Sequence, residues 1–383
     1  MRITILRQLP LAVFSLLSAC SIISAQSNFN LKFSNSTIYT GIEVGSKGVK
    51  MSMVEIGGNA QSRGAFNILK DTTINTDFIS FSPATFEATL NGLCHLYQLA
   101  GRKYKIPSKN VFTVISSGVK IQAQKESKTE WIKTLIDSFR LRVNEPERIV
   151  EVVDVIDEAR LSHLGIIPES KRFSTFLIDI GSGNTKGGYF PYDNTKHFKL
   201  FELTWGTKST ANAAEKLCGD DNSLLHFNRM LSRVLAGAEN SEIIYAVNAS
   251  GAYALNDHIA ISGGIAWALA TLMHPELIDH SVVSVTYEEV YDFQKKILDN
   301  HASLSGEALA RTVKDGAVDK SEVIKTANTV NKVFDQKSLL AGTGLLLKMM
   351  RQFKSIYETK EFFLVKNGQV GWVSAYVDQS INN

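Results

Sequence analysis

Two segments of this 383-residue chain share one pattern, in which an apolar strand ends in an acid, turns through glycines and continues as a second strand. The first segment contains IEVGS (42–46) and the second contains IDIGSGNT (178–185). Alternating apolar residues on both sides of these turns predict β-hairpins over residues 37–58 and 175–190. Further strands and helices follow each hairpin, so we expect two related α/β lobes.

Periodicity and turn residues predict the other elements. We expect helices over residues 84–102, 129–141 and 156–165, and strands over 110–116 and 258–262. The final apolar segment, 361–377, is expected to close the chain's pattern with short strands. Each lobe is then a mixed sheet flanked by helices.

The N-terminal segment, residues 1–19, has the pattern of a secretory signal, with two arginines, a short apolar centre and small residues before Cys20. The apolar run is shorter than the ~20 residues that span a membrane. The LSAC sequence ending at Cys20 resembles a bacterial lipobox, in which the cysteine is lipidated. We therefore expect an exported protein, lipid-anchored in a bacterial cell envelope, with residues 20–37 as a tether. The alternative is simple cleavage near Ala25, with loss of Cys20.

Net charge and cysteine content bear on whether the protein binds nucleic acid or zinc. The formal charge is +3, and it falls to +1 without residues 1–19. A near-neutral body does not hold nucleic acid by bulk charge, so a polyanion has to meet a local group of charges. Cys94 and Cys218 remain beside Cys20, and no Cys/His spacing indicates zinc. A disulfide between Cys94 and Cys218 is permitted by an oxidising compartment but not indicated.

Three glycine turns carry the expected chemistry. Glycines let backbone N–H groups approach a phosphate, and the strand-end acids Glu43 and Asp179 can hold Mg²⁺ or Mn²⁺ beside it. A third turn, Gly263-Gly264, ends a strand and opens a helix. Each turn alone is a weak signal, because such turns are usually only connections. The phosphate-binding residues expected from the three turns are Gly45, Ser46, Lys47, Gly181, Ser182, Gly183, Asn184, Thr185, Gly263 and Gly264.

The order of the three turns resembles that of the actin/heat-shock-chaperone/sugar-kinase superfamily. Within it, DEAR (157–160) is similar to the acidic-acidic-Ala-Arg signature of the exopolyphosphatase/guanosine pentaphosphatase family. The segments ISSGVK (115–120) and LAGTG (340–344) resemble further parts of that family. The resemblance implies an α/β fold of two ribonuclease H-like (actin-like ATPase) lobes, residues 38–160 and 161–383, with a cleft between them.

The same resemblance implies an enzyme, a Mg²⁺-dependent hydrolase that releases terminal phosphate from polyphosphate or a polyphosphorylated nucleotide. Glu158 matches the family's general base, and Lys120 stands where the family has an arginine near the phosphate. Outside the cytoplasm polyphosphate is the better substrate, since guanosine pentaphosphate is a cytoplasmic signal. A homodimer is left open.

Several positions depart from the family pattern. Glu43 stands where the family has aspartate, Lys47 where asparagine is usual, and Lys120 loses the two-pronged geometry of arginine. A catalytically altered phosphate- or nucleotide-binding module, or a scaffold of the same fold, is therefore the alternative to an enzyme. A kinase of the sugar or acetate type is a third hypothesis, disfavoured by the export signal and by the DEAR run. The alternative for Glu158 alone is a solvated residue in a first helical turn.

Overall fold

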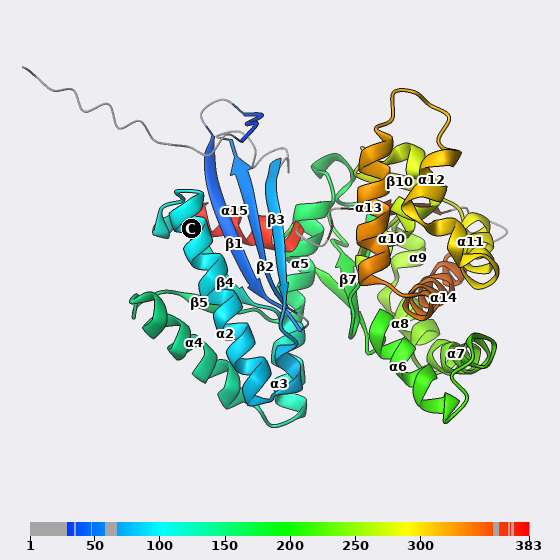
Figure 1. The fold of residues 1–383 in the computed structure, drawn as a ribbon, viewed down its shortest axis with the longest axis horizontal. Helices are drawn as coiled ribbons and strands as arrows, with labels where there is room; N and C mark the ends of the chain where they lie inside the picture. Colours follow the sequence, from blue (N-terminus) through cyan, green and yellow to red (C-terminus); the bar gives the residue numbers. More distant parts are fainter. Residues whose placement is uncertain are drawn as a thin grey trace, which may run out of the picture.

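The computed structural model describes residues 29–33, 36–46, 48–57, 67–354, 360–366, 368 and 371–382. They form two α/β lobes that lie side by side (Figure 1). The expected signal segment, Cys20 and Lys47 lie outside the described residues, so lipidation stays a prediction. Within the described part, every helix is too short or too polar to cross a membrane.

The first lobe is built on a five-stranded mixed sheet, which confirms the predicted hairpin over residues 37–58. β1 to β3 are antiparallel neighbours, and β4 and β5 run parallel to β1. The strand order is β3 (Asn67–Asn75), β2 (Gly48–Ile56), β1 (Thr37–Val44), β4 (Val111–Ile115) and β5 (Val150–Val152).

Three helices cover one face of this sheet: α2 (Pro83–Gln98), α3 (Ser117–Lys125) and α4 (Thr129–Val143). α2 begins where the Ser82 side chain accepts the N–H of Thr85, with Pro83 in its first turn. The predicted helix over 84–102 is confirmed as far as Gln98, after which one π-helical turn, Leu99–Lys103, follows. Ile42, Met51 and Leu93 are among the residues buried between sheet and helices.

The second lobe carries a six-stranded mixed sheet, and the predicted hairpin over residues 175–190 forms its β6–β7 pair. The strand order is β10 (Val282–Val285), β11 (Glu361–Val365), β9 (His258–Gly263), β6 (Thr175–Ile180), β7 (Thr185–Tyr189) and β8 (Lys199–Leu203). Two mixed sheets flanked by helices confirm the expected fold class.

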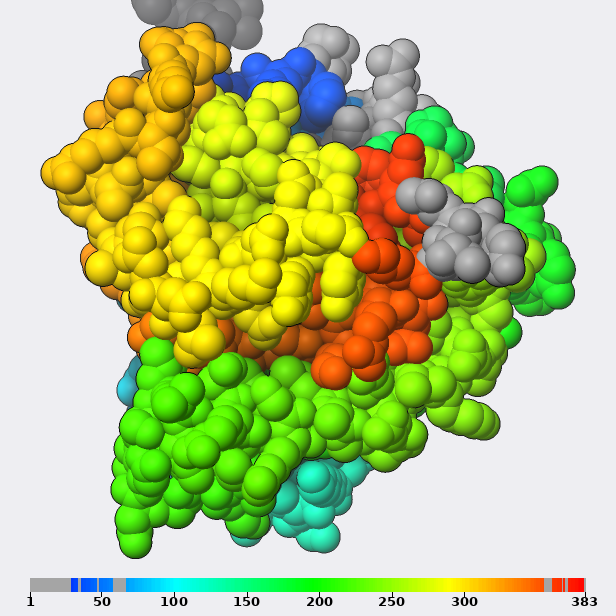
Figure 2. All heavy atoms as spheres, turned by 90° about the vertical axis from the view of Figure 1, so that its right-hand side faces the viewer, coloured from blue at the N-terminus to red at the C-terminus, as the bar shows by residue number. Residues whose placement is uncertain are grey.

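Helices of the second lobe enclose a larger core, in which Phe176, Phe227 and Leu340 are fully or almost fully buried. Figure 2 shows their outer face, with α11 and α12 in yellow above α6 and α7 in green. The helices are α6 (Thr207–Cys218), α7 (Leu224–Ala238), α8 (Ile244–Ser250), α9 (Ala252–Leu255), α10 (Gly264–Met273), α11 (Tyr287–Asp299), α12 (Gly306–Thr312), α13 (Lys320–Val333) and α14 (Gln336–Gln352).

Two helices join the lobes (Figure 1). α5 (Val155–Ile166) contacts β7 of the second lobe, and the predicted boundary at residue 160 lies within it. α15 (Gly371–Asn382) packs against α5 and β1. The prediction of strand at 371–377 is wrong, because this segment is helical and buries Trp372 and Val373 against the first lobe.

The cysteines lie in separate cores. Cys94 is buried in the core of the first lobe and Cys218 in that of the second, and both are free thiols. Each therefore serves as a small core residue.

The contact between α5 and α15 predicts a large cost for one added methyl group. A Cβ on Gly165 would lie 2.0 Å from the carbonyl oxygen of Gly371. Gly165→Ala should therefore lower the free energy of unfolding by about 1–3 kcal/mol, measured by urea denaturation. Gly237→Ala is the matched control, because nothing lies within 4 Å of its added Cβ in α7. It should stabilise the protein by about 0.5–1 kcal/mol. Equal changes in the free energy of unfolding for the two variants would contradict the close contact between α5 and α15.

Buried His163 predicts a pH dependence of stability. Burial lowers its pKa from 6.5 to about 4, although its Nε2 lies 3.0 Å from the Thr175 carbonyl oxygen. The unfolded chain then binds more protons than the folded one between these values. The contribution of the neutral His163 ring to the free energy of unfolding is therefore complete above pH 6.5. It is lost as the pH falls towards 4, at about 1.4 kcal/mol per pH unit.

His163→Phe should flatten that slope, because the ring would no longer titrate in the unfolded chain. Urea denaturation across this pH range measures it. Exposed His280 gives the control variant, His280→Gln, which should keep the slope. A slope that survives in His163→Phe would show that another group causes it.

Candidate functional site between the two lobes

The first glycine turn places a buried carboxylate at the end of β1. Glu43 is 6% exposed, and its Oε2 has no hydrogen-bond partner within the described structure. Burial raises the pKa of Glu43, against the attraction of Lys50, which lies directly opposite on β2. The turn is closed by the Gly45 N–H, which donates to the Gly48 carbonyl oxygen over 2.9 Å. Ser46 is half-buried beside Gly118 of α3.

The second hairpin repeats the arrangement. Asp179 is the last residue but one of β6, and Lys186 lies directly opposite it on β7. Both side chains therefore lie on the same face of the sheet. The Ser262 hydroxyl donates to Asp179 Oδ1 over 2.8 Å. Burial raises the pKa of Asp179, while Lys186 and the Ser262 bond oppose the shift.

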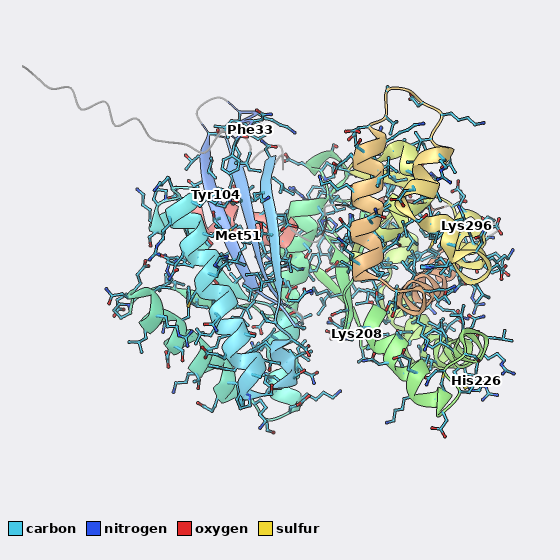
Figure 3. All side chains as sticks on the ribbon, in the orientation of Figure 1. Phe33, Met51, Tyr104, Lys208, His226 and Lys296 are labelled. Atoms are coloured by element: carbon cyan, nitrogen blue, oxygen red, sulfur yellow. The ribbon has the colours of Figure 1, made fainter. Side chains whose placement is uncertain are left out.

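The turn over residues 181–184 is held by the start of α6. The N–H of Thr207 donates to the Gly181 carbonyl oxygen over 2.9 Å, and the N–H of Lys208 donates to the Ser182 carbonyl oxygen over 2.8 Å. Lys208 lies on the side of the second lobe that faces the first (Figure 3). With its carbonyls turned towards α6, the turn leaves the N–H groups of Ser182, Gly183 and Asn184 without a backbone acceptor in the described part of the chain. Amides arranged in this way suit an anion.

One predicted phosphate donor is engaged elsewhere. Thr185 is fully buried, and its hydroxyl donates to the Trp205 carbonyl oxygen over 2.7 Å. Its role is to hold the turn rather than to face a ligand.

The third turn needs glycine for steric reasons. Gly263 has a φ of +94°, and a Cβ there would lie 2.2 Å from the Ile180 carbonyl oxygen. Only glycine therefore fits at position 263, because this φ is strained for other residues and the Ile180 backbone occupies the space of a Cβ. Gly264 then starts α10 at the same sheet edge as Asp179.

Glu158 lies at the meeting point of the two lobes. It stands in the first turn of α5 and is 2% exposed, so the solvated alternative is wrong. The Ser117 N–H donates to Glu158 Oε2 over 2.7 Å, and Lys186 Nζ lies 2.5 Å from Oε1. Burial alone would raise the pKa of Glu158, but Lys186 and Ser117 hold it below its usual range. The carboxylate is therefore ionised at neutral pH.

Lys120, which was expected near the phosphate, and Arg160 of the DEAR run have partners outside the charged site. Lys120 makes an ion pair with Asp154 at the surface. Arg160 lies 3.9 Å from Asp157 and donates to Gln379 of α15. Neither side chain is free to clamp a phosphate without first leaving its partner.

Sequence reasoning missed the two lysines of the site. Lys50 and Lys186 each follow a strand-end acid, Glu43 or Asp179, by seven residues. In a hairpin that spacing places the two charges opposite each other, as the strand registers show. Lys50 attracts both acids, and Lys186 attracts both acids and Glu158. We call Glu43, Lys50, Glu158, Asp179 and Lys186 the charge cluster.

The charge cluster is a poor match for a bound Mg²⁺ or Mn²⁺. The unpartnered Oε2 of Glu43 suits a metal ligand. Against it, the ammonium of Lys186 interacts with all three carboxylates of the cluster. Within the described residues, no three His, Cys, Asp or Glu side chains are placed to hold one ion. The residues therefore do not fit the metal, which stays a prediction from the resemblance.

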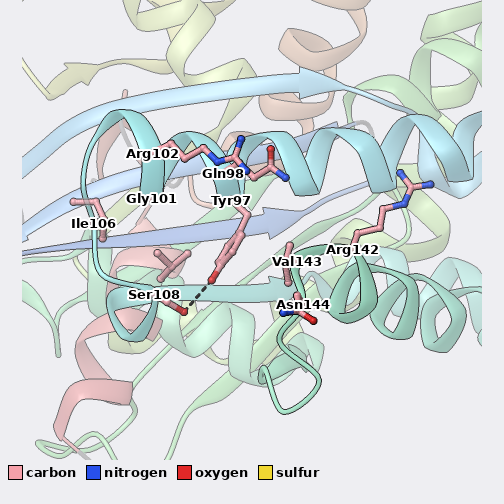
Figure 4. A pocket seen from close by; sticks show the side chains of 10 residues that line it. Tyr97, Gln98, Gly101, Arg102, Ile106, Ser108, Arg142, Val143 and Asn144 are labelled. Atoms are coloured by element: carbon pink, nitrogen blue, oxygen red, sulfur yellow. Dashed lines mark hydrogen bonds between the residues drawn. The ribbon is translucent and has the colours of Figure 1, made fainter.

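A separate pocket of about 400 Å³ lies in the first lobe, at the ends of α2 and α4 (Figure 4). The Tyr97 hydroxyl and Ser108 Oγ are 2.9 Å apart on its wall, and Arg102 and Arg142 line it. Arg142 is already paired with Glu87. None of its lining residues belongs to the charge cluster or to the glycine turns.

Comparison with known proteins identifies the fold. No family model matches the chain, and a search of curated proteins finds no match. Among solved structures, a Ppx/GppA family member from Aquifex aeolicus has a TM-score of 0.57 and 15% identity, over 91% of this chain and 98% of that one.

Two further structures agree. The type II variant of the A. aeolicus Ppx/GppA phosphatase has a TM-score of 0.56 and 16% identity, over 88% of this chain and 99% of its own. An exopolyphosphatase from Cytophaga hutchinsonii has a TM-score of 0.53 and 13% identity, over 90% and 98%. The similarity extends over both lobes. The resemblance predicted from the sequence is thus confirmed as a fold, and this chain has the two-lobed fold of the Ppx/GppA proteins.

Proposed function

We propose that this chain binds the terminal phosphates of polyphosphate, or of a phosphorylated small molecule, between its lobes and hydrolyses the terminal phosphoanhydride bond. One observation carries the proposal: Glu158 interacts electrostatically with the acids of both glycine turns, Glu43 and Asp179, and Asp179 lies at the Ser262–Gly263 edge. Asp179 contacts Ser262, and Glu158 contacts Ser117 and Lys186. The likeness in fold to an exopolyphosphatase supports this substrate class.

The turn amides and the lysines would hold the phosphate chain. The N–H groups of Ser182, Gly183 and Asn184 are available as donors, and charge-assisted bonds to phosphate are the stronger kind. Lys186 adds positive charge beside them. In phosphoryl transfer most catalysis is positioning and charge stabilisation, so such a site needs few reacting groups.

Glu158 would orient the attacking water. Its position is fixed by Ser117 on one oxygen and Lys186 on the other. Each carboxylate oxygen accepts two hydrogen bonds, so one lone pair on each remains for water. Because its pKa is lowered, Glu158 is a weak proton acceptor, and orienting water suits it better than abstracting a proton early.

The same ion pair favours a second candidate function, a binding protein of this fold without turnover. A carboxylate neutralised by a buried lysine loses much of its basicity. The glycine turns would then hold a phosphate chain, and Glu158 would serve to join the lobes through Ser117 and Lys186.

Glu158→Gln tests both functions. Phosphate release from long-chain polyphosphate by the purified residue 26–383 body, with and without Mg²⁺, should fall by about 100-fold or more. Binding of tripolyphosphate, measured by calorimetry, should remain. Glu130→Gln is the matched control, since Glu130 is an exposed acid in the first turn of α4. Unchanged turnover would exclude Glu158 from the reaction, and binding without release by the unaltered protein would favour the binding function.

Gly183→Ala tests the turn amides. An added Cβ at Gly183 meets no atom within 4 Å, so the fold should tolerate it. The methyl group would occupy the space through which a phosphate approaches the amides. We expect tripolyphosphate binding to weaken about tenfold, or about 1.4 kcal/mol, with unchanged thermal stability. Gly237→Ala should leave binding unaltered, and unweakened binding in Gly183→Ala would place the phosphate elsewhere.

A further inference from the structure

The charge cluster contains its own cations. Its three carboxylates belong to Glu43, Glu158 and Asp179, and its two ammonium groups to Lys50 and Lys186. Three negative charges against two positive ones leave one net negative charge.

Lys186 holds the central position. Its side chain is 11% exposed and approaches from β7, while Glu158 approaches from α5 and Asp179 from β6. Its Nζ lies 2.5 Å from Glu158 Oε1 and is attracted by Asp179 and Glu43 as well. A lysine surrounded by acids on different elements is fixed in the way that a bound cation would be.

The strand registers of the two hairpins place each acid opposite a lysine. Glu43 pairs with Lys50 across the first hairpin, and Asp179 pairs with Lys186 across the second. The acid and the lysine of each pair lie on the same face. Each strand-end carboxylate, which could have served as a metal ligand, therefore has a tethered ammonium group opposite it.

We infer that the ammonium group of Lys186 takes the place of the divalent cation at this site, so that the protein binds phosphate chains without Mg²⁺ or Mn²⁺. The metal would have to enter beside an ammonium group that contacts Glu158 and is attracted by Asp179 and Glu43, against repulsion between like charges. The statement about phosphate rests on the proposed function, whereas the statement about the metal does not.

Two measurements on residues 26–383 test the inference. Electron paramagnetic resonance counts the Mn²⁺ bound to the protein, and calorimetry measures tripolyphosphate binding in EDTA and in Mg²⁺. The unaltered protein should bind no Mn²⁺ stoichiometrically and should bind tripolyphosphate equally in both buffers. Lys186→Met should gain one Mn²⁺ site, lose about tenfold in tripolyphosphate affinity in EDTA, and recover it with Mn²⁺. Lys199→Met, an exposed lysine on β8, is the control and should change neither readout.

Stoichiometric Mn²⁺ on the unaltered protein would overturn the inference, and so would a Lys186→Met protein that gains no Mn²⁺. If Lys186→Met does not fold, the double variant Lys186→Met/Glu158→Gln removes both charges of the ion pair and keeps Glu43 and Asp179. A gained Mn²⁺ site in this double variant would support the inference, and no gain would overturn it. Absence of tripolyphosphate binding in every buffer would refute the proposed function alone, because the Mn²⁺ count still decides the role of Lys186.

Discussion

The carboxylate of Glu158 is held from two sides, by the Ser117 N–H of the first lobe and by the Lys186 ammonium group of the second. Both charges are almost fully buried, so removing Lys186 would leave the Glu158 carboxylate with the Ser117 N–H alone, at a cost of about 3–5 kcal/mol. Removing Glu158 costs less, because Asp179 and Glu43 still attract Lys186. The contact joins the start of α5 to β7, and the packing of α15 against α5 and β1 adds to the same junction. The glycine turns, each anchored in its own sheet, lie on either side of this pairing.

The two lobes repeat a chemical unit as well as a topology. In both, an antiparallel hairpin carries an acid at the end of the first strand and a lysine opposite it on the second. The copies differ in their surroundings. Lys50 remains half-buried on β2, whereas Lys186 is buried, contacts Glu158 and is attracted by Asp179 and Glu43. The second copy has thus become the electrostatic centre, and the first supplies Glu43 and Lys50 to its edge.

Local patterns predicted the hairpins well, since alternating apolar residues and glycine turns depend on few distant contacts. Asp179 was expected at the site because it ends a strand before a glycine turn, and Glu158 because the DEAR run resembles a family signature. The sequence did not indicate Lys186, because a lysine in a strand ordinarily faces solvent and only the register with Asp179 turns it inward. The segment from Gly371 is rich in aromatic and β-branched residues and suggested a strand. Packing against α5 and β1 overrides that preference and makes it helix.

The position of α15 has a consequence for the order in which the chain becomes structured during synthesis. Val373 and Val377 lie against Gly41 of β1, and Val377 is fully buried with Val54. Part of one face of the first sheet is therefore covered by α15, which follows the whole second lobe in the chain. Domains commonly fold in the order of their synthesis. Here the first lobe needs a helix that is made after the second lobe, so the apolar surface that α15 covers stays exposed during the synthesis of the second lobe.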